Sequence, residues 1–280
     1  LGQQLSQRLG QAVVIDNRPG AGTLLAAEIV AKAPADGYTL MVTTEATVTS
    51  NLHLYKRLPY DPVRDFEPVT QISSGAYMMV VHPSVPAKSI TELIAHAKAN
   101  PGKLNYGSSG SGGSPHMTME MFKLRSGTDI THVPFRGAGP MLVEVVAGRL
   151  ESGCDNMPSC IGHIRDGRLR ALAVTSNVRA AALPDVPTLA EAGIRDFEAT
   201  AWFGVQAPSR TPRPIIERLG AEIDVITRDP AYIARIAELG GAPPALTPAG
   251  GTSPESFDAF IRSEITKWAE VVKVSGATVD

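Results

Sequence analysis

The sequence predicts an α/β protein of two lobes with a ligand cleft between them. Short apolar runs typical of buried strands alternate with helix-like segments along most of the 280 residues. The connections are rich in turn residues, since the chain has 26 Gly and 22 Pro where average usage would give about 34 in total. The chain is expected to cross between the lobes near Gly102 and near Gly204. A cleft between lobes is a usual place for a ligand.

Helices are expected where the helix period coincides with residues that start or stop a helix. Thr23 and Ser89 are typical N-caps, and Glu92 completes a capping box with Ser89. Gly10 is a stop signal, and Pro115 suits a first helical turn. In order, the predicted helices span residues 1–9, 23–33, 89–98, 115–124, 140–147, 158–165, 188–192, 214–227, 230–239 and 254–274.

Strands are expected at the apolar runs between these helices. In order, they span residues 13–15, 38–43, 67–73, 76–81, 104–107, 131–134, 151–155, 169–175 and 200–207. The strand, glycine turn, helix and strand over residues 13–43 form a βαβ signature, which predicts that its two strands pair in parallel. Residues 104–203 are expected to form lobe 2, and residues 1–103 together with 204–280 are expected to form lobe 1.

The composition excludes several classes of function. Lys plus Arg (26) nearly balance Asp plus Glu (28), and a net charge of −2 supplies no basic field for nucleic acid. No run approaches the roughly 18 consecutive apolar residues of a membrane helix, and a hydrophobic content of 43% argues against disorder. The chain begins at Leu1 without a targeting signal, so we interpret it as an excerpt, a mature form or a truncated reading.

Three turns between a strand and a helix have small residues that suit an anion. In the strongest, residues 107–114, free backbone N–H groups and the dipole of the next helix can attract negative charge. This stretch is neither a Walker A loop nor a nucleophile elbow. Residues 18–23 and 133–140 repeat the pattern. A flexible linker at 107–114 is the alternative. Arg136 could pair with a carboxylate or be solvated, and the backbone amides of its turn are the better candidates.

A few side chains are candidates for roles in the cleft. Asp155 ends an apolar strand, so it can cap the next helix or reach a ligand. His116 follows the glycine-rich stretch and either shapes the cleft or bonds locally. Cys154 and Cys160 match no redox or zinc motif, and a disulfide and two free thiols both stay open. The histidines form no metal-binding pair, and no triad or paired-carboxylate motif stands out, so we expect no metal, no cofactor and no catalysis.

Six strings of residues carry a resemblance in their order and spacing. They are residues 17–22 (NRPGAG), 34–40 (PADGYTL), 132–137 (HVPFRG), 154–159 (CDNMPS), 169–175 (LRALAVT) and 183–188 (LPDVPT). Together they resemble the Bug family, which comprises extracytoplasmic solute-binding proteins of tripartite tricarboxylate transport systems. The resemblance covers essentially the whole chain.

The resemblance implies a periplasmic-binding-protein fold of type II with the ligand between the lobes. It implies a periplasmic monomer that captures a small carboxylate or amino acid, performs no chemistry on it and delivers it to membrane transporter subunits by transient contact. The ligand contacts implied by position are Thr44, Glu45, Ala46, Thr47, Ser108, Ser109, Gly137, Ala138 and Asp155. Pro19, Gly20, Ala21 and Gly22 would shape the lobe 1 side of the cleft.

The sequence departs from the family pattern at two points. Family members open with a signal peptide, a strand and a Pro-Phe-x-x-Gly-Gly-type loop that contributes to the site. This chain begins inside the helix that follows, so we expect lobe 1 to lack that strand and part of its ligand loop. Cys154 stands where the family more often has a bulky apolar residue, and with Cys160 it could form a bridge.

Two other functions stay open at this point. A ligand sensor would use closure of the lobes to signal to a receptor, and an α/β enzyme would act on a carboxylate in the same cleft. For the binding protein, we expect an open form that admits the ligand and a closed form that contacts from both lobes stabilise. The identity of the ligand is not encoded, because backbone amides and bridging waters leave little side-chain code.

Overall fold

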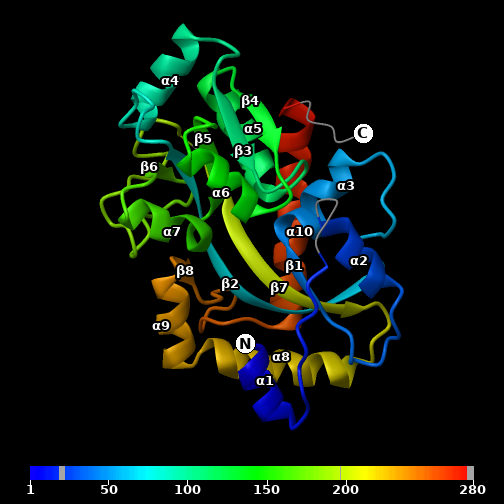
Figure 1. The fold of residues 1–280 in the computed structure, drawn as a ribbon. Helices are drawn as coiled ribbons and strands as arrows, with labels where there is room; N and C mark the ends of the chain where they lie inside the picture. The colour runs from blue at the N-terminus through cyan, green and yellow to red at the C-terminus, as the bar shows by residue number, and fades with distance from the viewer. Residues whose placement is uncertain (19–22, 196, 276–280) are drawn as a thin grey trace.

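The molecule is built on one continuous sheet with helices on both of its faces (Figure 1). The computed structural model describes residues 1–18, 23–195 and 197–275. The strands are β1 (Met41–Thr44), β2 (Phe66–Val81), β3 (Asn105–Ser108), β4 (Thr131–Pro134), β5 (Ser152–Asn156), β6 (Arg170–Val174), β7 (Thr200–Pro208) and β8 (Gly241–Ala242).

Helices precede, follow and connect these strands along the described part of the chain. They are α1 (Gly2–Leu9), α2 (Leu24–Ala31), the π-helix η2 (Ala46–Ser50), α3 (Asn51–Leu54), α4 (Ile90–Ala99), α5 (Ser114–Ser126), α6 (Ala138–Val146), α7 (Met157–Arg165), α8 (Arg213–Thr227), α9 (Pro230–Glu238) and α10 (Pro254–Ser275). Among the described residues, no helix combines the length and the apolar character needed to span a membrane.

Strand β2 joins two groups of strands, and these groups define the two lobes. Its first half, as far as Ala76, pairs antiparallel with β7 and β8, and β7 pairs antiparallel with β1. From Tyr77 onward it pairs antiparallel with β5 and β6, and β3 lies parallel to both β4 and β5. We call the part on β1, β7, β8 and the first half of β2 lobe 1, and the part on β3–β6 and the second half of β2 lobe 2. Lobe 2 is the upper part of the molecule in Figure 1.

Each lobe buries apolar side chains on both faces of its strands. In lobe 1, Val69 lies in the core under α1, α8 and α9, whereas Trp202 lies in the core under α2 and α10. In lobe 2, Phe122 belongs to the core that includes α4 and α5, and Met141 belongs to the core of α6 and α7. Burial on both faces explains why many strand residues form apolar runs instead of alternating with polar ones.

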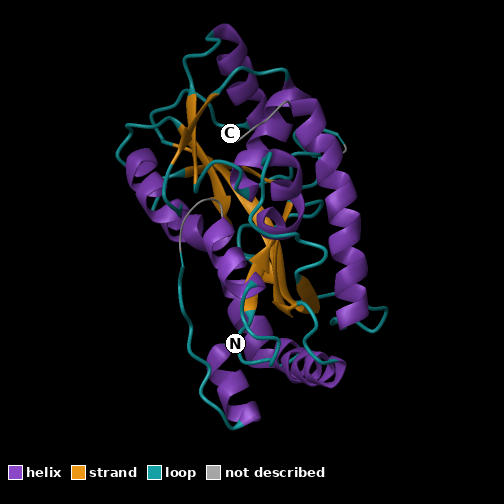
Figure 2. Ribbon diagram, turned by 90° about the vertical axis from the view of Figure 1, so that its right-hand side faces the viewer, coloured by secondary structure: helices purple, strands orange, loops and turns teal. Residues whose placement is uncertain are grey.

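Helix α10 packs into both lobes with one face. Phe257 and Ile261 are buried in the lobe 1 core, and Trp268 and Val272 are buried in the lobe 2 core. These positions recur at four- and seven-residue spacing, which places them on one stripe of the helix. Figure 2 shows this long helix alongside the strands of both lobes.

Most predicted elements are confirmed, including the strand at 131–134 with its limits, but the first strand is wrong. Residues 13–15 form no strand, and the side chains of Val14 and Ile15 are 83% and 67% exposed. The predicted parallel partner of residues 38–43 is therefore wrong as well. Strand β1 instead pairs antiparallel with β7, so that Met41 is opposite Gln206. An apolar triplet alone does not distinguish a buried strand from an exposed extended segment.

Two further predictions change for local reasons. Residues 67–73 and 76–81 are one strand, because Ser74 and Gly75 stay paired with Trp202 and Ala201 of β7. Residues 188–192 form turns and no helix, and Thr188 is bridged to Val174. The strands change partner at Tyr77, which is earlier than the crossing predicted near Gly102. As domain limits, 1–103 with 204–280 and 104–203 stay a prediction.

Candidate functional site

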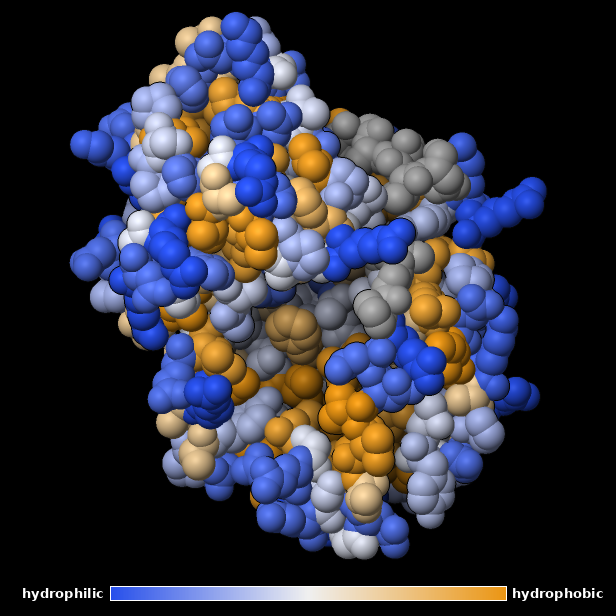
Figure 3. Space-filling model, viewed as in Figure 1, coloured by the Kyte–Doolittle hydropathy of each residue, from blue (hydrophilic) through white to orange (hydrophobic). Residues whose placement is uncertain are grey.

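A cavity of about 1020 Å³ lies where the two lobes meet. Figure 3 shows the surface hollowed at this place, between the upper and lower parts of the molecule. Its lining comes from the start of α2, from β1 and η2, from β7, and from the β3–α5 and β4–α6 loops. The lining residues are Arg18, Thr23, Ala26, Met41, Val42, Thr44, Ala46, Thr47, Tyr55, Tyr77, Ser109, Gly110, Ser111, Gly113, Ser114, Pro115, Pro134, Phe135, Arg136, Gly137, Asn156, Trp202 and Phe203.

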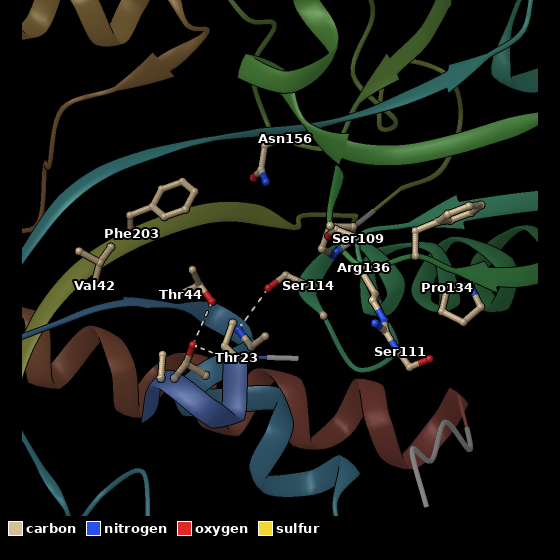
Figure 4. Close-up of a pocket in the computed structure, with 18 of the residues that line it drawn as sticks. Thr23, Val42, Thr44, Ser109, Ser111, Ser114, Pro134, Arg136, Asn156 and Phe203 are labelled. Carbon is tan, nitrogen blue, oxygen red and sulfur yellow. Dashed lines mark hydrogen bonds between the residues drawn. The ribbon is translucent and has the colours of Figure 1, made fainter. Parts of the chain in front are cut away.

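The lobe 1 wall presents linked hydroxyl groups. We define this wall as the lining residues of β1, η2, β7 and the start of α2, which are Thr23, Met41, Val42, Thr44, Ala46, Thr47, Trp202 and Phe203. Thr47 Oγ1 lies 2.9 Å from Thr23 Oγ1 and 3.2 Å from Thr44 Oγ1 (Figure 4). Thr23 flanks α2 as predicted, but its side chain makes no capping bond and its φ is +79°. Its hydroxyl contacts Thr47 instead, which connects the start of α2 to η2.

Glu45 faces away from the cavity, although it was expected to contact the ligand. It follows β1 directly and is fully buried, and its Oε1 accepts bonds from Thr49 Oγ1 at 2.6 Å and from the Ser50 amide at 3.2 Å. Burial raises the pKa of this carboxyl, and the hydroxyl and amide donors only partly oppose the rise. Glu45 therefore supports η2 from behind, and Thr44 and Ala46 on either side of it line the cavity.

The lobe 2 wall, which we define as residues 109–115 and 134–137 with Asn156, is made mostly of main-chain loops. The glycine-rich loop reaches the cavity through Ser109, Gly110, Ser111 and Gly113. Ser114, the first residue of α5, accepts a hydrogen bond at its Oγ from the Ala46 amide of lobe 1 at 3.1 Å (Figure 4). This bond ties the two walls together beside the cavity.

The second loop of the lobe 2 wall joins β4 to α6. Gly137 precedes α6 with a φ of +103°, a conformation that favours glycine, and its amide donates to the Ser109 carbonyl at 3.1 Å. Arg136 lines the cavity beside it, and Figure 4 shows its side chain near Ser111. Ala138 starts α6 and does not belong to the lining. Of the two predicted ligand contacts in this turn, Gly137 lines the cavity and Ala138 does not.

Asp155 lies behind Asn156 and only Asn156 lines the cavity. Asp155 Oδ1 accepts bonds from the backbone amide of Asn156 at 2.8 Å and from its Nδ2 at 3.1 Å. Burial raises the pKa of Asp155 to about 6, against the bonds from Asn156 and Ser159, which lower it. Since a carboxylate only accepts hydrogen bonds, this contact fixes which end of the Asn156 amide faces Asp155. Asp155 thus orients the Asn156 side chain without lining the cavity itself.

Of the predicted ligand contacts, the structure brings Thr44, Ala46, Thr47, Ser109 and Gly137 together around the cavity. Glu45, Ser108, Ala138 and Asp155 lie outside the lining, as does His116, which was expected to shape the cleft. The residues Pro19, Gly20, Ala21 and Gly22 lie outside the described part of the chain. Cys154 and Cys160 are both free and buried, so the disulfide is not formed. As ligand contacts, the predicted residues stay a prediction.

Sequence reasoning missed several lining residues. Asn156 directly follows Asp155, so proximity was a usable signal, and Ser114 is the last residue of the predicted stretch at 107–114 although it was not named as a ligand contact. Thr47 was a predicted ligand contact and Thr23 lies in the predicted turn at 18–23, but their hydroxyl contact joins positions 24 residues apart, which no spacing rule connects. Phe203 of β7 is half-buried and lines the cavity, and it was not among the predicted site residues. Contacts between residues that are distant in the sequence are created by the fold, and no local sequence pattern indicates them.

The cavity favours negative charge. Among its described lining residues, the only charged side chains are Arg18 and Arg136. Helices α5 and α6 begin at the cavity rim, and the first amides of a helix carry a partial positive charge. Hydroxyl groups of serine and threonine add donors that can rotate. This arrangement can hold carboxylate groups, and no acidic side chain among the lining residues that the structure describes would repel them.

Comparisons with known proteins agree with this arrangement. A sequence model of the family described as "Tripartite tricarboxylate transporter family receptor" matches residues 1–276. Protein BugT of Bordetella pertussis is 36% identical over 278 residues, which cover 99% of this chain and 83% of BugT.

Solved structures extend the similarity to the whole fold. The structure of Rpa4515 of R. palustris with adipate has a TM-score of 0.93 and 36% identity, covering 99% of this chain and 91% of that one. MatC of Rhodopseudomonas palustris with bound malate has a TM-score of 0.90 and 31% identity, covering 97% and 91%. The periplasmic binding protein BugD has a TM-score of 0.90 and 28% identity, covering 99% and 91%. The predicted two-lobed periplasmic-binding-protein fold is confirmed.

Proposed function

We propose that this chain, which belongs to the tripartite tricarboxylate transporter receptor family and to its Bug proteins, captures a small carboxylate in the periplasm and delivers it to a transporter of that class. The proposal includes a monomer that performs no chemistry on its ligand and contacts membrane subunits transiently. The relatives with adipate and with malate support a carboxylate ligand, because both are similar to this chain over nearly its whole length.

The single observation that carries the proposal is the chemistry of the cavity lining. Two guanidinium groups, several hydroxyl groups and two helix starts face a space with no acidic side chain among its described lining residues. Charge-assisted hydrogen bonds between arginine and carboxylate are among the stronger polar contacts in proteins. A volume of about 1020 Å³ leaves room for a small acid together with bridging waters.

The same lining favours a dicarboxylate over an amino acid. An α-ammonium group needs a cluster of acceptors, ideally a carboxylate, within hydrogen-bond distance. Glu45 and Asp155 adjoin lining residues in the sequence, but both carboxyl groups are buried outside the lining. Glu45 accepts a hydrogen bond from Thr49, and Asp155 accepts one from the Asn156 amide. A second carboxylate on the ligand, in contrast, would find Arg18 or Arg136. We therefore expect dicarboxylates to bind more tightly than amino acids of the same length.

Isothermal titration of the purified protein with a matched panel tests the proposal. The panel contains adipate, malate and succinate, with aspartate, glutamate and the uncharged diamide of adipate as comparisons. We expect at least one dicarboxylate to bind, and the diamide to bind at least about tenfold more weakly because it loses the charge-assisted bonds. Binding of amino acids alone, or conversion of any bound acid to a product, would contradict the proposal.

Delivery to a transporter needs a separate measurement. Uptake of the labelled acid that binds best is followed in cells or vesicles that contain tripartite tricarboxylate membrane subunits, with and without this protein. We expect uptake to depend on the protein. Tight binding without any stimulation of uptake would favour the ligand sensor and would leave the carboxylate site itself intact.

A further inference from the structure

Two histidine rings are stacked behind the lobe 2 wall, one on α5 and one on β4. The ring centroids of His116 and His132 are 3.9 Å apart, with 16° between the planes. Tyr106 of β3 stacks on His132 at 4.9 Å. His116 is 7% exposed and His132 is half-buried, and neither ring lines the cavity. We call His116 and His132 the histidine pair.

Each ring of the pair bonds to one end of the glycine-rich loop. His116 Nδ1 accepts a hydrogen bond from the Gly112 amide at 3.1 Å. Because an amide N–H can only donate, Nδ1 carries no proton here, and His116 is neutral with its proton on Nε2. At the other end, His132 Nε2 lies 2.7 Å from Ser108 Oγ, which accepts from the Gly110 amide at 3.2 Å.

The loop that the pair holds is the largest part of the lobe 2 wall. Ser109, Gly110, Ser111 and Gly113 all line the cavity. The Ser109 carbonyl also accepts the bond from the Gly137 amide, so the second loop of this wall depends on the position of the first. A change at the histidine pair would therefore move donors on both loops without any direct contact between the pair and a ligand.

A proton added to His116 works against this arrangement. The new Nδ1–H group would face the Gly112 amide, so that two donors would point at each other and the bond would be lost. A charge on His116 would also lie against the neighbouring ring of the pair, 3.9 Å away. The neutral form of the pair and the observed loop therefore stabilise each other.

The other titratable groups around the pair come from α5 and β3. Glu120 Oε1 lies 3.9 Å from His116 Nε2 and accepts bonds from Tyr106 Oη and Lys123 Nζ, each at 2.8 Å. Burial lowers the pKa of His116, and Lys123 adds to this while Glu120 opposes it. Burial, the ring of His116 and Lys123 together lower the pKa of His132 to about 3.

We propose that His116 and His132 are positioning residues for the ligand site, that their neutral forms hold the loop at 109–113 in the shape that receives a carboxylate, and that protonation of His116 releases the loop. This inference rests on the proposed carboxylate-binding function. Since the pKa of His116 lies below its ordinary value of 6.5, affinity is expected to be constant around neutral pH and to fall in acid.

Three variants separate positioning from simple structural support. His116→Asn places Oδ1 near the position of Nδ1, so an acceptor for the Gly112 amide remains but cannot be protonated. His116→Leu removes the acceptor and keeps a side chain of similar size. His82→Asn is the matched control, because the Nδ1 of His82 also makes a local bond, to Ser84 Oγ at 2.7 Å, and lies outside the cavity lining.

The experiment measures the Kd of adipate by isothermal titration between about pH 7.5 and 4.5, the range in which histidine titrates. Each variant is compared with the wild type at the same pH, because this ratio cancels the titration of adipate itself. We expect His116→Leu to bind about three- to tenfold more weakly at neutral pH, the effect of one lost hydrogen bond. We expect His116→Asn to match the wild type at neutral pH and to bind more tightly than it in acid. His82→Asn should follow the wild type throughout.

A second measurement does not need a ligand. In the ligand-free protein, NMR reports the protonation of the His116 ring and the protection of the Gly112 amide from hydrogen exchange. We expect protection to be lost as the ring becomes protonated in the wild type, and to persist at the same pH in His116→Asn. Equal pH profiles for wild type and His116→Asn, in affinity or in protection, would overturn the inference. If no carboxylate binds while the loop responds as expected, the proposed function fails and the positioning of the loop stands.

Discussion

In lobe 1 the cavity wall consists of side chains held by core packing and by contacts between hydroxyl groups, whereas in lobe 2 it consists of main-chain loops held from behind by buried polar side chains. Trp202 and the Thr23–Thr47–Thr44 hydroxyl network represent the first construction. The glycine-rich loop with the histidine pair represents the second. On this comparison, we expect the lobe 1 wall to be sensitive to the loss of core side-chain volume. We expect the lobe 2 wall to be sensitive to the protonation state of the histidine pair.

The largest expected effect concerns the packing of the lobe 1 wall against its core. Trp202 is 1% exposed, contacts Phe257 and Phe260 edge-on, and donates from Nε1 to Glu264 Oε2 at 3.2 Å. We expect Trp202→Ala to lower the free energy of unfolding by about 3–5 kcal/mol, the usual range for an aromatic core residue. Urea unfolding measures this. The matched control is Phe203→Ala, one position along the strand and half-buried, for which less than half of that loss is expected. Equal losses would show that packing does not set this wall apart.

The next effect concerns a buried acid behind the lobe 2 wall. The pKa of Asp155 is about 6 in the folded protein, above its ordinary value of 3.8. Between these values the folded state binds more protons than the unfolded state, so stability falls as the pH rises from about 4 to about 6. At neutral pH we expect Asp155→Asn to raise the free energy of unfolding by about 2–3 kcal/mol, and at about pH 4 to change it little.

Two comparisons make the Asp155 prediction specific. Asp166→Asn replaces an exposed carboxylate paired with Arg168, and it should change stability by less than about 0.5 kcal/mol at either pH. Asp155→Ala should weaken carboxylate binding, because it removes the acceptor that orients Asn156. If Asp155→Asn changes stability by the same amount at both pH values, the buried-acid interpretation is contradicted. If Asp155→Ala leaves the affinity unchanged, the role of Asp155 is limited to its hydrogen bonds at the start of α7.

A smaller effect compares the two arginines, one beside each wall. Arg18 is exposed and donates to Asp16 at 2.9 Å, whereas Arg136 has no ion pair within the part of the chain that the structure describes. We expect Arg136→Gln to weaken dicarboxylate binding about tenfold and Arg18→Gln about threefold, as measured by titration at low salt. The difference should shrink in high salt because exposed charges are screened. A larger loss for Arg18→Gln would reverse the assignment.

The smallest effect probes the hydroxyl network of lobe 1. Thr47→Val keeps the shape of the side chain but removes the hydroxyl that contacts Thr23 and Thr44. We expect a loss of affinity of about two- to fivefold, which corresponds to one or two exchanged hydrogen bonds. A double-mutant cycle with Thr44→Val tests whether the hydroxyls act together, and additive losses would mean that each contributes alone.

The sequence predicts the repeating strand–helix pattern well, because periodicity and caps are local. The N-cap at Ser89 forms as expected, with the Glu92 amide donating to Ser89 Oγ at 3.2 Å, but the Glu92 carboxylate accepts from the Lys88 amide at 2.7 Å and not from the Ser89 amide that a capping box requires. The strand at 13–15 fails because a short apolar run does not reveal whether a partner strand covers it. Strand β2 was predicted as two strands because Ser74 and Gly75 have a weak strand preference. Their pairing with β7 overrides this preference in the structure.

The site is predictable in its loops but not in its side-chain directions. The glycine-rich stretch and the turn at Gly137 do line the cavity. Glu45 and Ser108 adjoin lining residues but turn inward, Glu45 toward η2 and Ser108 toward His132. Which neighbour faces the cavity is decided by the exact end of a strand, and sequence patterns leave strand ends uncertain by a residue or more. The partnership of His116 and His132 depends on strand register, which no motif encodes.

Helix α10 gives the molecule a mechanical property as well. Its 22 residues, about 33 Å of helix, are anchored in the core of lobe 1 near one end and in the core of lobe 2 near the other. Both α10 and β2 run through the two lobes. Unfolding of one lobe would therefore expose apolar side chains of these elements that are buried in the other lobe. We expect calorimetry to record a single melting transition whose van't Hoff and calorimetric enthalpies agree. Any closing motion of the lobes would have to bend this helix or slide one lobe along it.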